Sequence, residues 1–193
     1  GRVYVWDAAS GLLLKEIDYG IHAKAPALTI DPANSLVAVG LHPDLYVFDL
    51  TTGTSVFNAS TGNVWAAQFS PDGSQLAVGT AGDSVLIYDT TNWDLLYDWT
   101  GLHGGSIFTL DYSEDGAYLL TGGYDATAKV WDIAAETLLV ILEGHTGAVT
   151  DAVFYPDGAH VLTGSGLEES AWGYDWADFD ARVYKWSQIG RAS

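Results

Sequence analysis

Short runs of apolar residues alternate with polar turns along the whole chain. The runs are rich in Val, Leu, Ile and aromatic residues, and Gly, Pro, Asp and Asn bound them, as is usual for β-strands. Their apolar positions are often consecutive, which is typical of strands covered on both faces. No segment of about ten residues or more shows helical periodicity. The pattern therefore predicts an all-β protein built from many short strands.

The runs recur in a fixed order about every forty residues. Five segments resemble one another, namely VYVWD, LYVFD, VLIYD, AKVWD and RVYKW, and their aromatic anchors lie 42, 40, 43 and 55 residues apart. Each unit holds four runs, with a tight Pro- or Asp-Gly-containing turn before the fourth. Units of four strands at this period are typical of a β-propeller. The anchors are Trp6, Phe48, Tyr88, Trp131 and Trp186.

The segments GHTGAVTDAVFYPDGAHVLTGS and LTGGYDATAKVWD resemble the WD-repeat (WD40) family of β-propellers. The resemblance covers essentially the whole chain, and the motif is specific because it repeats. It implies a single propeller segment of about four repeats, 1–193, whose parts are a partial blade with the first blade (1–49), a second blade (50–89), a third (90–132), a fourth (133–187) and a tail (188–193).

The strands do not add up to a closed ring of four blades. The third-strand pattern occurs five times, at both ends of the chain, whereas each of the other three patterns occurs four times. WD-repeat rings usually have seven or eight blades, so we expect an arc of such a ring, from a chain that has no initiator Met. The open ends would expose apolar surface and favour self-association or the remaining blades as partners. Two copies joined into one eight-bladed ring is the alternative.

In the family that the chain resembles, a buried hydrogen-bond network links a loop histidine, a Ser or Thr, a turn aspartate and a strand tryptophan. The resemblance implies two such sets, namely His103, Thr121, Asp125 and Trp131, and then His145, Thr163, Asp180 and Trp186. Buried carboxylates and indole N–H groups need such partners. The alternative is a catalytic triad, but an active site normally occurs once and no nucleophile-elbow pattern surrounds the threonines. We therefore expect no catalytic residue.

The first two complete units depart from this pattern. In the second, the turn acid Asp83 is shifted by one place and Ser60 stands where a histidine is expected. In the first, the turn is one residue shorter and contains Pro43. We expect both blades to lack the full network.

The last unit contains an insertion at 167–178, between its second and third strands. Exposed aromatic side chains in a loop are unusual unless they cover something. The aromatics either fold back on a blade, bind a protein partner, or belong to a ligand or Ca²⁺ site with Asp175, Asp178 and Asp180. The partner-binding candidates are Glu168, Glu169, Trp172, Tyr174 and Trp176.

Composition narrows the function classes. Twenty-five acidic against seven basic residues give a net charge of −18, which repels nucleic acid and anionic lipid. No apolar run is long enough to span a bilayer, so no membrane insertion is expected. Cysteine is absent and the five histidines have no zinc-site spacing. No phosphate-binding glycine motif occurs, so we expect no metal and no cofactor.

These observations predict a non-catalytic scaffold that presents loops to other proteins in a multiprotein complex, as the family resemblance implies. The alternative is a ligand-binding or structural propeller of an extracellular or salt-adapted assembly, suggested by the acidic charge and the aromatic insertion. A propeller hydrolase would need a cluster of convergent polar residues near the channel, and the sequence offers none.

Overall fold

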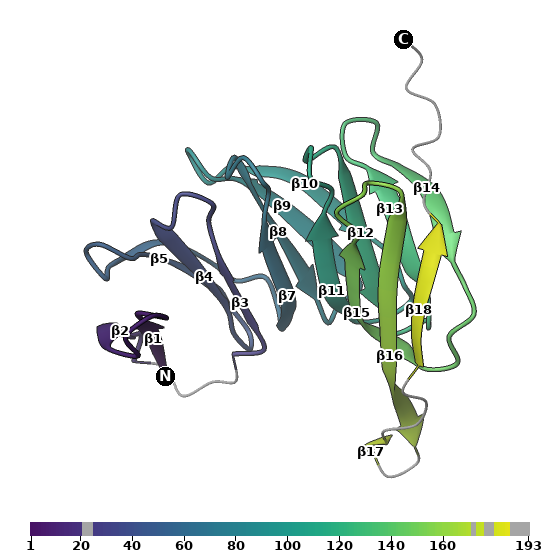
Figure 1. The fold of residues 1–193 in the computed structure, drawn as a ribbon, viewed down its shortest axis with the longest axis horizontal. Helices are drawn as coiled ribbons and strands as arrows, with labels where there is room; N and C mark the ends of the chain where they lie inside the picture. Colours follow the sequence, from purple (N-terminus) through teal and green to yellow (C-terminus); the bar gives the residue numbers. More distant parts are fainter. Residues whose placement is uncertain (21–24, 171–172, 176–179, 186–193) are drawn as a thin grey trace.

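The computed structural model describes residues 1–20, 25–170, 173–175 and 180–185, with the backbone alone for 167–170, 173–175 and 180. All the regular elements in these ranges are β-strands (Figure 1). The predicted all-β fold is therefore confirmed. No helix among the described residues is long and apolar enough to cross a bilayer.

The strands form one two-stranded hairpin and four larger antiparallel sheets, in which neighbours along the chain pair. The hairpin consists of β1 (Arg2–Trp6) and β2 (Leu13–Asp18). The first complete sheet consists of β3 (Ala27–Ile30), β4 (Leu36–Gly40), β5 (Leu45–Asp49) and β6 (Ser55–Ala59). The second consists of β7 (Val64–Phe69), β8 (Gln75–Thr80), β9 (Ser84–Asp89) and β10 (Leu95–Thr100). The third consists of β11 (Ile107–Tyr112), β12 (Tyr118–Gly123), β13 (Ala128–Asp132) and β14 (Thr137–Leu142).

The last sheet is built differently. It contains β15 (Ala148–Phe154), β16 (His160–Ser170), β17 (Gly173–Asp175) and β18 (Asp180–Lys185). The long strand β16 pairs with β15 and β18 along its first part and with β17 at its end. Within the described residues, this sheet therefore has three propeller strands and an added hairpin.

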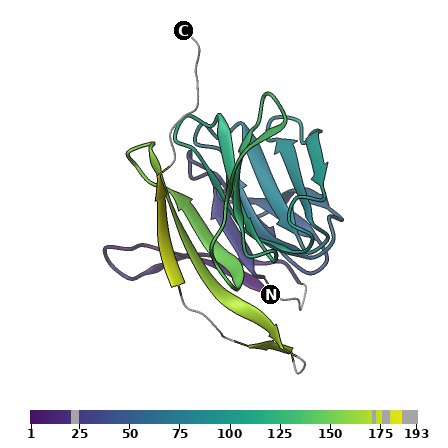
Figure 2. The same cartoon turned by 90° about the vertical axis from the view of Figure 1, so that its right-hand side faces the viewer.

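The sheets stand side by side in chain order and form an arc (Figures 1 and 2). Their first strands are neighbours, since β3 contacts β7, β7 contacts β11 and β11 contacts β15. The sheets are called blades below and numbered one to four from β3 onward. The hairpin β1–β2 packs against blade one through Val3 and Ile17. Blades two and three are thus covered on both faces, as their runs of consecutive apolar residues predict.

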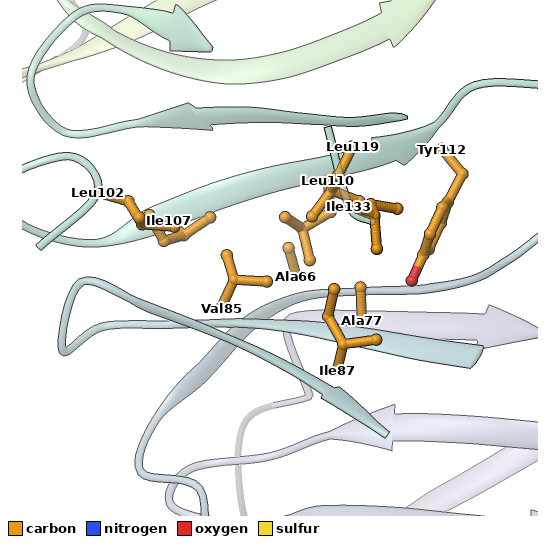
Figure 3. Close-up of a cluster of buried hydrophobic side chains, with 10 residues drawn as sticks. All are labelled: Ala66, Ala77, Val85, Ile87, Leu102, Ile107, Leu110, Tyr112, Leu119 and Ile133. Atoms are coloured by element: carbon orange, nitrogen blue, oxygen red, sulfur yellow. The ribbon is translucent and has the colours of Figure 1, made fainter. Parts of the chain in front are cut away.

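Side chains from facing sheets fill the space between blades. Figure 3 shows this for blades two and three, where Val85 and Ile87 of β9 face Leu110 and Leu119 of β11 and β12. Several of these side chains have no exposed surface, among them Ile87 and Leu119. Burying one such aliphatic side chain contributes about 1.5–3 kcal/mol. Contacts between sheets therefore hold the blades in order.

The tight turns before the fourth run of each unit have the backbone that their sequence predicts. Gly73, Gly116 and Gly158 have φ values of 75°, 70° and 65°. Asn34 occupies the matching place in blade one with φ 54°. Glycine and asparagine tolerate this left-handed conformation better than other residues. The carboxylate of an aspartate closes these turns. Asp72, for example, accepts hydrogen bonds from the hydroxyl of Ser70 and from the amide and hydroxyl of Ser74.

At the N-terminal end of the arc, apolar side chains are exposed whose equivalents in the inner blades are buried. Leu28 is 63% exposed, whereas Leu110, which has the same place in β11, is 8% exposed. The anchor Trp6 is 58% exposed, whereas the equivalent Phe48 and Tyr88 are 5% and 7% exposed. A cavity of about 300 Å³ lies between β1 and β3 and is lined mainly by apolar residues. In the inner blades, the preceding sheet covers these positions.

Candidate functional site

The structure brings His103, Thr121, Asp125 and Trp131 together in blade three. His103 reaches Asp125 Oδ1 with Nδ1 at 2.8 Å and Thr121 Oγ1 with Nε2 at 2.7 Å. The indole N–H of Trp131 donates to Thr121 Oγ1 at 3.0 Å. These bonds connect the loop before β11 with β12, with the β12–β13 turn and with β13.

One assignment of protons satisfies every member of this set. The indole N–H of Trp131 is only a donor, so the Thr121 oxygen accepts from it and its hydroxyl proton is directed at His103 Nε2. His103 Nε2 then accepts, and its Nδ1–H donates to the Asp125 carboxylate. A neutral imidazole is sufficient, and no donor or acceptor in the relay is left over. The four residues are called the relay below.

The Asp125 carboxylate has further partners that the sequence did not reveal. Thr127 donates to Oδ1 from its hydroxyl at 2.7 Å and from its amide at 3.1 Å. Lys129 donates to Oδ2 at 2.7 Å and also to the Leu102 carbonyl at 2.5 Å. Burial by itself would raise the pKa of Asp125, but the bonds from His103, Lys129 and Thr127 outweigh it and hold the pKa well below its usual range. The alternation of side chains along β13 could have identified Lys129, since it follows Thr127 on the same face.

The relay has the atomic order of a hydrolase triad, but its threonine is enclosed. Thr121 is 0% exposed and His103 is 1% exposed. A nucleophile must reach the atom that it attacks, and here the Thr121 oxygen already accepts the indole N–H of Trp131. The arrangement therefore binds the elements of one blade together, and its threonine is not accessible to a substrate.

Two other blades lack the relay because the central hydroxyl is missing. The strand registers place Val39 of β4 and Val78 of β8 where blade three has Thr121. Both valines are buried, at 1% and 0% exposure. The tryptophan is replaced in the same blades, by Phe48 and Tyr88, which carry no indole N–H. Hydroxyl and indole are thus absent together, so the missing hydroxyl leaves no indole donor at the anchor position without its acceptor.

The turn acids of these two blades bind the loops that follow them. Asp83 Oδ1 accepts from the backbone amide of His103 at 2.5 Å, which ties blade two to the loop that leads into blade three. Ser60 donates to Asp44 Oδ1 of blade one at 2.8 Å. Ser60 precedes Val64 by four residues, as His103 precedes the equivalent Ile107, so it does stand in the histidine position of blade two, but its partner belongs to the preceding blade.

The second predicted set needs a correction. His145 Nε2 lies 2.7 Å from Thr163 Oγ1, as in blade three. However, the ladder pairs Val161 with Tyr184, in the way that Leu119 pairs with Trp131. The same register makes Asp180 equivalent to Thr127 and leaves Trp186 two residues beyond the anchor position.

Trp186 lies outside the described residues, as does the side chain of Asp180. The prediction aligned RVYKW with AKVWD by its last tryptophan, whereas ARVYK is the segment in register. The shared order of alanine, a basic residue, valine and an aromatic residue would have revealed this. Tyr184 donates its hydroxyl proton to the Glu143 carbonyl at 2.7 Å. The anchor of blade four therefore bonds to the loop before β15.

The insertion is a hairpin where its backbone is described. Glu168 pairs with Asp175, Glu169 with Tyr174 and Ser170 with Gly173, so β16 continues four residues past Gly166. Figures 1 and 2 show β17 and the end of β16 projecting beyond the neighbouring blades. The predicted loop is in this part an extension of the sheet, because the strands go on pairing. Trp172 and Trp176 lie outside the described residues, as do Asp178 and the side chains of Glu168, Glu169, Tyr174 and Asp175.

No group of three or more His, Cys, Asp or Glu side chains within the described residues could hold a metal ion. His103 and His145 are engaged with threonines, and His160 Nδ1 lies 2.6 Å from Asp157 Oδ2 within its own turn. The side chains of Asp175, Asp178 and Asp180, the oxygen ligands expected in the insertion, are not among the described ones.

Asp125→Asn should lower the free energy of unfolding by about 1–2 kcal/mol at neutral pH, since the hydrogen bonds from His103, Lys129 and Thr127 lose their charged acceptor. The pKa of Asp125 is lower in the folded chain than in the unfolded chain. Its stabilising contribution is therefore complete above about pH 5 and is lost as the pH falls below about 4. Urea unfolding of both proteins between about pH 3 and 7 should show their difference shrinking only below about pH 4. A difference that is constant over this range would contradict the assignment.

Comparison with known proteins identifies the repeats of this chain. A family model described as WD domain, G-beta repeat, matches residues 52–89, 96–132 and 136–171, which is more than half of the chain. Its three matches include the relay of blade three and the His145–Thr163 pair of blade four.

Several curated proteins are similar to the chain over part of its length. WD repeat-containing protein VIP3 of Arabidopsis thaliana is 32% identical over 131 residues, which cover 60% of this chain and 41% of that protein. Guanine nucleotide-binding protein subunit beta of Schizosaccharomyces pombe is 29% identical, covering 66% and 42%. U3 small nucleolar RNA-associated protein 12 of Saccharomyces cerevisiae is 28% identical, covering 59% and 12%. The chain thus spans less than half the length of each of these relatives.

Among solved structures, that of U3-55K superimposes with a TM-score of 0.72 at 20% sequence identity. The match covers 86% of this chain and 50% of that one. At this level of identity the similarity concerns the fold, and it agrees with the arc of blades described above.

Proposed function

Because the chain belongs to the WD-repeat family, we propose that it is part of a β-propeller that serves as a non-catalytic scaffold for protein–protein interactions. The observation that carries the proposal is the burial of Thr121 and His103 in the relay. The hydroxyl and the imidazole that could act as nucleophile and base are enclosed, at 0% and 1% exposure, and are bonded to each other. What the blades offer to other molecules is the surface of their loops and edges.

The names of three relatives agree with such a role. They are described as a subunit of a guanine nucleotide-binding protein, a receptor-associated protein and an RNA-associated protein. For this chain, the net charge of −18 disfavours direct contact with phosphate backbones and favours protein partners.

Further blades of the same propeller are the proposed partners of the ends of the arc. At the N-terminal end, Leu28 and Ile30 are 63% and 48% exposed, whereas the equivalent Leu110 and Tyr112 of blade three are 8% and 5% exposed. Apolar surface of this kind is rarely left uncovered. A preceding first strand, packed as β7 packs on β11, would cover both residues.

The insertion hairpin is the proposed contact for a protein partner. Its backbone pairing holds it as an extension of β16, beyond the neighbouring blades (Figure 1). Its sequence supplies the candidate anchors Trp172, Tyr174 and Trp176 between Glu168, Glu169 and further acids. Trp and Tyr are the residue types that most often dominate the binding energy of interfaces.

The test of this contact is a deletion of the insertion, with end points chosen so that the strand register of blade four is kept. Thr163 pairs with Arg182 as Thr121 pairs with Lys129, so removing residues 167–177 gives blade four a turn of the same length as that of blade three. We expect this variant to keep the melting temperature of the parent within a few degrees and to lose its protein partners in affinity capture from cells of the source organism. Asp94→Asn with Asp98→Asn, on and beside the outer strand β10, is the control and should retain them.

Two results would count against the proposal. If the shortened protein captures the same partners as the parent, then the hairpin is not the contact. If it unfolds at a much lower temperature, then the insertion packs on its own blade and belongs to the core.

A further inference from the structure

A second candidate contact lies between blades three and four, where β11 and β15 end. A cavity of about 330 Å³ opens there. It is lined by Asp111, Tyr112, Glu114, Phe154, Tyr155 and Pro156. Three of these side chains are aromatic and two are carboxylates, and no basic residue is among them.

The walls of this cavity are fixed by contacts within the fold. Asp111 Oδ2 accepts the backbone amide of Phe154 at 2.7 Å, which orients the carboxylate and joins the two blades. Tyr112 is 5% exposed, and its hydroxyl donates to Gln75 Oε1 at 3.4 Å. Tyr155, by contrast, is 48% exposed at the rim. The site is therefore a pocket whose Asp111 wall is held in place and whose rim carries an exposed aromatic ring, that of Tyr155.

The carboxylates of the pocket favour binding of a positive charge. Burial raises the pKa of Asp111, and the nearby carboxylate of Asp151 adds to the rise, although the Phe154 amide opposes it. Three of the described basic residues, Arg2, Lys15 and Lys129, are engaged elsewhere, with Glu16, the Thr51 carbonyl and Asp125. A cation entering the pocket would offset the repulsion between the carboxylates of Asp111 and Asp151. It would also meet aromatic faces, which attract cations.

We propose that this pocket receives a lysine or arginine side chain of a protein partner, between the carboxylates of Asp111 and Glu114 and the rings of Phe154 and Tyr155. The inference deepens the proposed scaffold function and rests on it. It names a second contact, away from the insertion hairpin, and the chemistry that would recognise it. The aromatic rings would hold the apolar stem of the side chain as well as its charge.

The test uses three capped amino acids as probes, in NMR titrations of the ¹⁵N-labelled 193-residue chain. N-acetyl-lysine N-methylamide and its arginine counterpart should shift the amides of residues 111–116, 153–155 and 157–158 with saturation. The norleucine counterpart, which has no charge, should not. Raising the salt from low to physiological ionic strength should weaken the binding.

Variants make the result specific. Glu114→Gln and Tyr155→Ala should each weaken binding of the lysine probe by roughly threefold. Glu136→Gln, the same change of charge in the β13–β14 turn, should leave it unaltered. Equal shifts with norleucine, or shifts spread over the acidic surface without saturation, would overturn the proposal. Removing residues 167–177 should not affect the titration, so a failure here leaves the insertion hairpin as a separate question.

Discussion

Replacing Gly122 by alanine should lower the free energy of unfolding by about 2–3 kcal/mol, although alanine is normally accepted in a strand. Gly122 lies in β12, where blade three faces blade four. A Cβ atom there would lie 2.7 Å from Val149 Cγ1, 2.6 Å from Thr109 Cγ2 and 3.2 Å from the Val149 carbonyl oxygen. Since one of these atoms belongs to the backbone of β15, the two sheets would have to separate. Urea unfolding followed by tryptophan fluorescence measures the loss.

The matched control is the same substitution in blade four. Gly164 occupies the position of Gly122, and the nearest described atom to its added Cβ is Asp151 Cβ at 3.9 Å. Gly164→Ala should therefore change stability by less than about 0.5 kcal/mol. Equal losses of stability in the two variants would show that the space between sheets is not the reason for glycine at this position. A large loss only at Gly164 would show that another layer packs on blade four.

Replacing Thr121 by valine should cost about 2–4 kcal/mol, although the shape of the side chain is kept. Valine fits this position, since Val39 and Val78 occupy it in blades one and two. In blade three, however, the lost hydroxyl bonds both His103 Nε2 and the indole N–H of Trp131. Each polar atom would be left buried without a partner, and each costs about 1–3 kcal/mol in that state.

A double-mutant cycle separates this network effect from packing. Trp131→Phe removes the indole donor, and combining it with Thr121→Val would reproduce the pair of side chains found in blade one, Val39 with Phe48. The double variant should therefore be more stable than the sum of the single losses implies, by about 1 kcal/mol. Losses that simply add would mean that Thr121 and Trp131 act independently, and that the 3.0 Å bond between them contributes nothing.

The sequence by itself determined the fold class, the order of the strands and the position of the turns. These features are local or repeated. Runs of Val, Leu and aromatic residues, with Gly or Asn where φ is positive, define each strand and turn without reference to the rest of the chain. Repetition identified the units, and the resemblance of these units to the WD-repeat family then implied the set of His103, Thr121, Asp125 and Trp131.

Only the tertiary structure decided the register of blade four and the connections between blades. An insertion shifts every later spacing, so the sequence placed Trp186 where the ladder places Tyr184. The partners of Asp83 and Ser60 and the clash at Gly122 depend on distances between separate sheets. Such distances depend on how whole side chains fill the space between sheets, and no spacing along the chain encodes them.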